Sequence, residues 1–128
     1  MPIDKNINLK ELRVGNLVYD EYCLFQEIDI ESFINYKQGS LKPIPLTDDT
    51  LLKFGFEKEE FWEDYILEKE VFLQNENDGY GLIKCLDGFK FCVDSETGFN
   101  TINEKSYNYL HEIQNLYFAL TNTELVCQ

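Results

Sequence analysis

The sequence has few of the residues from which most catalytic and metal sites are built. Among its 128 residues there is one histidine, His111, and there are four cysteines. A zinc site needs three or four nitrogen or thiolate ligands brought together, and Cys23, Cys85, Cys92 and Cys127 form no C-x-x-C pair. We therefore expect neither a metal site nor a cysteine–histidine nucleophilic pair, and we interpret the cysteines as reduced, small hydrophobic residues.

The common phosphate-binding and hydrolytic motifs are also missing. The sequence contains no G-x-x-x-x-G-K-[ST], no G-x-G-x-x-G and no G-x-S-x-G. Carboxylates are abundant, so a metal-dependent hydrolase built on them remains an alternative, although no lysine has an acidic residue two places before it. We expect a protein that is not an enzyme and that needs no cofactor.

Long apolar runs are absent. No stretch reaches the roughly 18 consecutive apolar residues of a membrane span, and the opening MPIDKNINLKEL has no basic segment followed by an apolar run. We therefore expect a cytoplasmic protein that is neither exported nor inserted in a membrane.

Basic residues are scarce. Eleven stand against 24 acidic residues, which gives a net charge of -13, and the acids are spread over both halves of the chain. Such a field repels nucleic acid and anionic membranes, and it attracts basic protein surfaces. The charge predicts a basic protein partner and no direct DNA binding. Charge that serves only solubility is the alternative interpretation.

The apolar pattern predicts a single α+β domain over residues 1–128 with an antiparallel sheet. Short apolar runs from Leu12 to Tyr36 predict two or three strands in hairpins. The stretch from Lys37 to Pro45 predicts a loop that hinges two halves of the domain. Thr47 as N-cap and Gly55 after the last turn predict a short middle helix from Asp48 to Phe54.

The C-terminal half predicts a meander and a helix. Tyr65–Gln74 has the pattern of a strand, and two Asp-Gly pairs indicate hairpins in a sheet of three or four strands. If Asp87-Gly88 is a two-residue turn, Leu86 lies opposite Phe89, and Cys85 and Cys92 form a diagonal pair on the other face. Helical spacing predicts an amphipathic helix from Tyr109 to Leu120. The predicted core face of the meander holds Leu82, Leu86, Phe89, Phe91 and Val93.

The segment from Glu57 to Glu70 combines acidic and aromatic residues most densely. Seven acids against two lysines leave it a net charge of -5, and it holds the only tryptophan of the chain. Rings that lose water on binding and carboxylates that pair with Arg or Lys suit an interface. The predicted partner-binding residues are Glu57, Glu59, Glu60, Phe61, Trp62, Glu63, Asp64, Tyr65, Glu68 and Glu70.

Two further interpretations of this segment stay open. It could form a solvated edge whose aromatic rings turn inward to the core. On a strand, Glu68 and Glu70 would project from one side at a spacing of about 7 Å, close to that of successive backbone phosphates, which is compatible with mimicry of nucleic acid.

Three blocks of the sequence resemble a family of small proteins from phages and prophages of Bacteroidetes. The blocks are ELRVGNLVYD (11–20), PIPLTDDTLLKFGFEK (43–58) and YLHEIQNLYFALTNTEL (109–125). Most proteins of this family have no assigned function, so the resemblance implies a phage origin more firmly than a mechanism. A phage-borne acidic protein without catalytic motifs resembles counter-defence inhibitors, and the candidate is an anti-CRISPR that acts on the type VI-B RNA-guided RNase Cas13b or its guide-RNA-binding surface. A structural or morphogenesis protein of the virion is the alternative.

Overall fold

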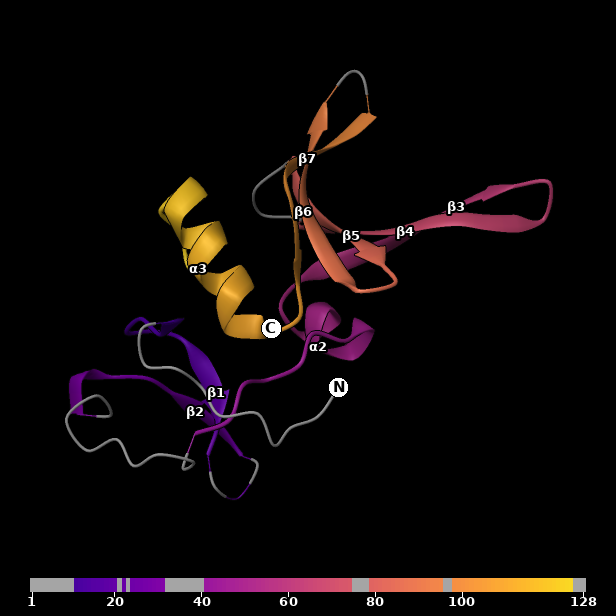
Figure 1. Ribbon diagram of the computed structural model, residues 1–128. Coiled ribbons are helices and arrows are strands. Elements are labelled where there is room, and N and C mark those ends of the chain that lie inside the picture. The colour runs from indigo at the N-terminus through magenta and orange to yellow at the C-terminus, as the bar shows by residue number, and fades with distance from the viewer. Residues whose placement is uncertain are drawn as a thin grey trace. The chain divides into compact units, whose positions relative to one another are not determined.

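The computed structural model describes residues 11–20, 22, 24–31, 41–74, 79–95 and 98–125. They belong to two compact units, one formed by the chain up to Pro45 together with Tyr109–Leu125, and one formed by Leu46–Asn108. The predicted α+β class is confirmed, since both units contain an antiparallel sheet and a helix (Figure 1). The unit boundary falls at the end of the predicted hinge loop. A single domain over 1–128 stays a prediction.

The first unit is built on a short hairpin and a helix. β1 (Leu17–Tyr19) pairs antiparallel with β2 (Phe25–Glu27), as the sequence predicts for this region. Its buried cluster consists of Val18, Ile28 and Leu41. Cys23 and residues 32–36 of the predicted hairpin region lie outside the described residues.

The helix α3 (Leu110–Thr121) confirms the predicted C-terminal helix within one residue at either end. It buries Leu110, Ile113 and Tyr117, while Leu120 is exposed. The amide of Tyr109 donates to the Glu112 carboxylate at 3.1 Å, which satisfies one of the free N–H groups at the helix start. Asn122 ends the helix in the left-handed conformation, with φ of 56°.

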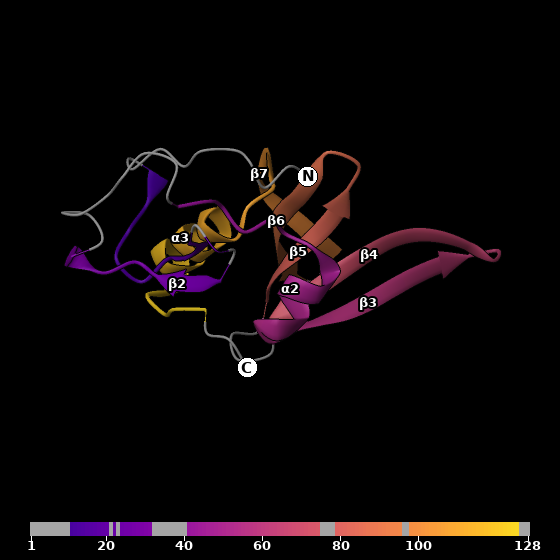
Figure 2. The ribbon, with the colours of Figure 1, turned by 90° about the horizontal axis from the view of Figure 1, so that it is seen from below.

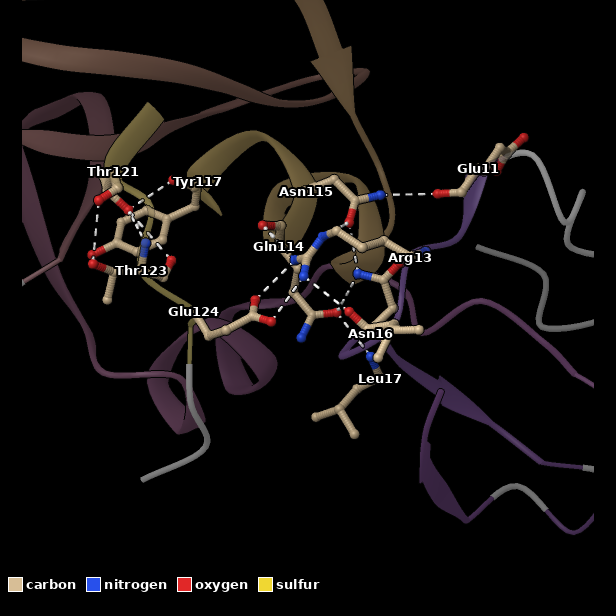
Figure 3. Close-up of polar contacts among 11 residues, drawn as sticks. Glu11, Arg13, Asn16, Leu17, Gln114, Asn115, Tyr117, Thr121, Thr123 and Glu124 are labelled. Carbon is tan, nitrogen blue, oxygen red and sulfur yellow. Dashed lines mark hydrogen bonds and ion pairs between the residues drawn. The ribbon is translucent and has the colours of Figure 1, made fainter. Parts of the chain in front are cut away.

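Polar side chains fix α3 to the segment before β1 (Figure 3). The Arg13 guanidinium donates to both carboxylate oxygens of Glu124 at 2.8 Å and through Nε to Asn115 at 3.0 Å. Asn16 is fully buried and donates to the same Asn115 oxygen at 2.7 Å. His111 is buried too, with Nε2 3.1 Å from a Glu11 carboxylate oxygen. The only histidine thus contributes to the packing of this unit.

The second unit begins with the helix α2 (Asp48–Lys53), which confirms the predicted middle helix. The Thr47 hydroxyl accepts a hydrogen bond from the Thr50 amide at 3.1 Å, as expected of an N-cap. Gly55 follows the C-cap Phe54 with φ of 83°, a conformation that favours glycine.

Five strands follow α2 as an antiparallel meander in which each strand pairs with the next. They are β3 (Phe56–Glu63), β4 (Ile66–Gln74), β5 (Tyr80–Cys85), β6 (Gly88–Ser95) and β7 (Gly98–Tyr107). The sheet has five strands, whereas three or four were predicted. β3 was missed because only Phe56 of its residues is buried, so it lacks the alternating apolar pattern of a half-buried strand.

The register of β5 and β6 corrects the predicted turn. Cys85 pairs with Gly88 and Lys84 with Phe89, so the two-residue loop is Leu86–Asp87 rather than Asp87–Gly88. Gly88 is thus the first residue of β6, next to β7. A side chain at this position, where φ is 140°, would collide with the Tyr107 carbonyl, so the position favours glycine. The face containing Leu82, Phe89 and Phe91 is buried as predicted, Val93 is half-buried, and Leu86 is fully exposed in the turn.

The cysteine prediction is corrected by the same shift. Cys92 pairs with Gly81 and Cys85 with Gly88, so the two cysteines share a face but are not diagonal neighbours. Both are free thiols, Cys92 buried and Cys85 half-buried.

Candidate protein-binding hairpin

β3 and β4 form a projecting hairpin, called here the β3–β4 arm and defined as Glu57–Glu70. The two strands pair along their length, whereas the described pairing of β4 with β5 runs through Val71, Phe72 and Leu73. The arm therefore extends past the neighbouring strand β5 (Figures 1 and 2). It contains every predicted partner-binding residue, either on a strand or in the connecting turn.

The base of the arm is held by an ion-pair network. Lys58 Nζ lies 3.3 Å from an Asp48 oxygen and 3.4 Å from a Glu70 oxygen. Lys84 Nζ lies 3.0 Å from the other Asp48 oxygen and 3.4 Å from the other Glu70 oxygen. The Glu70 side chain is 16% exposed, so its charge is compensated within the chain. Glu60 lies 3.8 Å from Lys58 and joins the same network.

The network shifts the pKa values of its members. Burial raises the pKa of Asp48, but hydrogen bonds from Lys84 and Lys58 outweigh this effect and bring the pKa below its ordinary value. The Asp48 hydrogen bond is the main reason why the pKa of Lys58 and that of Lys84 are raised. All three groups are therefore charged at neutral pH, and they anchor the arm to α2 and β5.

Phe61 turns toward the sheet. Its ring centre is 5.7 Å from that of Phe99 on β7 in an edge-to-face arrangement. Lys69 Nζ lies 5.1 Å from the Phe61 ring centre and 5.2 Å from that of Phe99, within the range of cation–π contacts. This ring is half-buried against the sheet and is not part of the buried core.

A β-bulge interrupts the arm at Glu68. Phe61 pairs with Lys69 and Trp62 pairs with Leu67, which leaves Glu68 as the extra residue of β4. The bulge breaks the regular alternation of β4, and the Glu70 carboxylate is already bound by Lys58 and Lys84. The evenly spaced carboxylate pair expected for mimicry of successive phosphates is therefore not formed.

The tip of the arm exposes aromatic rings. Trp62 is 58% exposed and Tyr65 is 99% exposed. These rings do not turn inward, and together with Asp64 they line a hollow beside the turn. Exposed apolar surface often marks an interaction site. The exposed rings therefore distinguish the tip from an edge that is only solvated.

The turn itself is strained. Asp64 and Tyr65 have φ angles of 50° and 65°, which places two residues with side chains in the left-handed region of a two-residue turn. This conformation costs roughly 1–2 kcal/mol for a residue such as Tyr65, whereas Asp tolerates it better, and Asn-Gly is the usual sequence there. Sequence reasoning missed the turn because Asp-Tyr carries no hairpin signature.

The outer carboxylates of the arm are not neutralised by the chain. Glu57, Glu59 and Glu63 are exposed, and across the ranges that the structure describes none of them forms an ion pair with a lysine or arginine. The arm therefore presents negative charge along β3 and aromatic rings at its tip. This arrangement can pair with cations and desolvate rings on a partner.

Within the described ranges no group of three or more His, Cys, Asp or Glu side chains is placed to hold a metal ion. No helix in that part of the chain is long and apolar enough to cross a membrane. The comparisons with protein-family models, curated proteins and solved structures found no match for this chain.

Proposed function

We propose that this protein is a non-catalytic inhibitor that acts in the bacterial cytoplasm by docking its β3–β4 arm on a basic protein surface. The observation that carries this proposal is the projecting arm, with exposed Trp62 and Tyr65 at its tip and uncompensated carboxylates along β3. Exposed rings of this size commonly serve as desolvated anchors in protein interfaces.

The charge of the chain supports a basic partner. A net charge of -13 speeds the encounter with a positively charged surface at low salt. From Glu57 to Glu63 the arm is about 20 Å long at the usual rise of a strand. It is long enough to enter a basic groove such as one that holds an RNA strand.

The resemblance to phage counter-defence proteins suggests which basic surface is met. An RNA-guided nuclease of the Cas13b type offers a Lys- and Arg-rich surface for its guide RNA. Most of the arm lies outside the three blocks that carry the resemblance, since only Glu57 and Lys58 fall within one. The arm is therefore the part of the chain best suited to protein-specific binding.

Affinity capture tests the proposal. The immobilised protein is offered the nuclease with guide RNA, the nuclease alone and the guide RNA alone, at low and at high salt. We expect retention of the nuclease at low salt and weaker retention at high salt. If neither nuclease sample is retained at low salt, the proposal is wrong, and stable self-association instead would favour a virion structural protein.

A matched pair of variants tests whether the arm is the docking site. Glu57→Gln, Glu59→Gln and Glu63→Gln together remove three negative charges from the arm. Glu27→Gln, Glu31→Gln and Asp49→Asn together remove three from exposed positions elsewhere. We expect the arm variant to slow association about tenfold and the control variant to have a smaller effect. Equal effects would mean that only net charge matters.

A further inference from the structure

The hollow at the tip of the arm has the chemistry of a receptor for an organic cation. Its lining consists of Trp62, Asp64 and Tyr65. Both rings expose their surfaces to solvent, and a carboxylate stands between them in the sequence. Aromatic faces attract cations through their quadrupole, and a neighbouring carboxylate adds a charged hydrogen-bond acceptor.

The described chain does not fill this hollow with a cation of its own. Lys58 is engaged by Asp48 and Glu70 at the base of the arm. Lys69 lies over the Phe61 and Phe99 rings. Asp64 takes part in none of the ion pairs formed by the residues that the structure describes. The complementary cation is therefore expected from a partner.

The shape of the site favours a guanidinium group. Trp62 is 58% exposed and Tyr65 is 99% exposed, so each ring has an open face on which a flat cation can stack. Arginine is planar, weakly hydrated and able to pair with a carboxylate through two hydrogen bonds. A methylated ammonium group is bound best by aromatic residues that surround it.

We propose that Trp62, Asp64 and Tyr65 form the receptor for one arginine side chain of the partner, which stacks on the two rings and pairs with the Asp64 carboxylate. This inference rests on the proposed function, because it names the group on the basic surface that the tip of the arm recognises. The strained turn agrees with it. Asp64 and Tyr65 occupy left-handed positions where Asn-Gly would fold more easily, and both residues supply a side chain to the hollow.

Fluorinated tryptophan gives a direct test, because Trp62 is the only tryptophan of the chain. Global replacement by mono-, di- and trifluorotryptophan changes this ring alone and progressively weakens the negative potential of its face. The probe is a capped Gly-Arg-Gly peptide, titrated by the fluorescence or ¹⁹F signal of residue 62. We expect affinity to fall stepwise, by about two- to fivefold over the whole series.

Peptide and protein controls sharpen the test. Capped Gly-Lys-Gly and its trimethyl-lysine analogue should bind more weakly than the arginine peptide. Asp64→Asn and Tyr65→Leu should each weaken arginine binding, whereas Tyr22→Leu, which removes an exposed tyrosine of the other unit, should leave it unchanged. An affinity independent of fluorination, or equal affinity for the lysine peptides, overturns the arginine receptor.

The outcome separates this inference from the proposed function. Nuclease capture is measured with the same fluorinated proteins. Capture without any dependence on fluorination overturns the receptor and leaves docking of the arm intact. Stepwise loss of arginine-peptide binding without nuclease capture supports the receptor and overturns the proposed partner.

Discussion

Glu60 and Glu70 lie directly opposite each other on β3 and β4, and Lys58 stands within 3.8 Å of the first carboxylate and 3.4 Å of the second. Like charges at directly opposed positions destabilise a sheet. The lysine offsets this repulsion and also contacts Asp48 on α2. Together with Lys84, this lysine compensates the negative charge at the base of the arm.

We expect Lys58→Gln to destabilise the protein, because Glu60 and Glu70 then face each other without this cation. Glu70→Gln removes one of the two charges, so the same lysine substitution should cost less in that background. Chemical unfolding of the two single variants and the double variant measures the difference. Equal losses in both backgrounds would show that Lys58 does not act through Glu70.

Stability should fall in acid through Asp48. Hydrogen bonds from Lys84 and Lys58 outweigh burial and hold its pKa below the ordinary value of 3.8. A carboxyl group whose folded pKa is lowered contributes stability above its unfolded pKa, and this contribution is lost as pH falls through the folded pKa. Asp48→Asn should therefore be less stable at neutral pH and should flatten the stability profile below about pH 4.

Unfolding midpoints of the wild type and Asp48→Asn across that range provide the measurement. Asp49→Asn is the matched control, since Asp49 is the neighbouring exposed acid of α2 and pairs with neither lysine in the described network. A wild-type acid profile identical to that of Asp48→Asn would contradict the assignment.

Replacing the two turn residues of the arm should raise the stability of the protein and weaken its binding of arginine. Asp64→Asn with Tyr65→Gly places the preferred residues at φ angles of 50° and 65°. We expect a gain of roughly 1 kcal/mol in the free energy of unfolding, together with weaker binding of the arginine peptide. Thermal unfolding and peptide titration check both halves. A loss of stability would show that the turn is not strained.

The hydrogen bonds of the Arg13 side chain should require arginine at this position, and lysine should not replace it. Its two terminal nitrogens each donate to a Glu124 oxygen at 2.8 Å, and Nε donates to Asn115 (Figure 3). Lysine keeps the charge but cannot reproduce three donors in this geometry, so Arg13→Lys should cost about 1–2 kcal/mol. Glu124→Gln, which keeps one acceptor oxygen, should cost less in the same unfolding assay. An unchanged Arg13→Lys would contradict this account.

Local signals in the sequence predicted both helices well. The Thr47 cap and Gly55 placed α2, and the spacing of Leu110, Ile113 and Tyr117 placed α3. These features depend on residues within one or two turns, so the sequence contains all the information that they need.

Pairing between distant residues was predicted less well. In the observed register of β5 and β6, Gly88 lies so close to the Tyr107 carbonyl that a side chain would collide with it, and no local turn rule contains this contact. The bulge at Glu68 likewise arises from pairing with β3. The many charged residues of β3 leave no alternating apolar pattern by which the sequence would indicate a strand. The sequence nevertheless indicated the segment that forms the candidate site, because acids and aromatic rings are densest there.

The sequence by itself determined the acidic field, the α+β composition and the two helices, since charge, periodicity and capping are properties of the chain or of short stretches of it. Tertiary structure decided which residues of the acidic segment face a partner. Lys84 is remote from Glu70 in sequence, yet together with Lys58 it compensates the Glu70 charge, and Phe99 packs against Phe61. Trp62, Asp64 and Tyr65 stay outside because the hairpin extends past β5, and only folding sets that length.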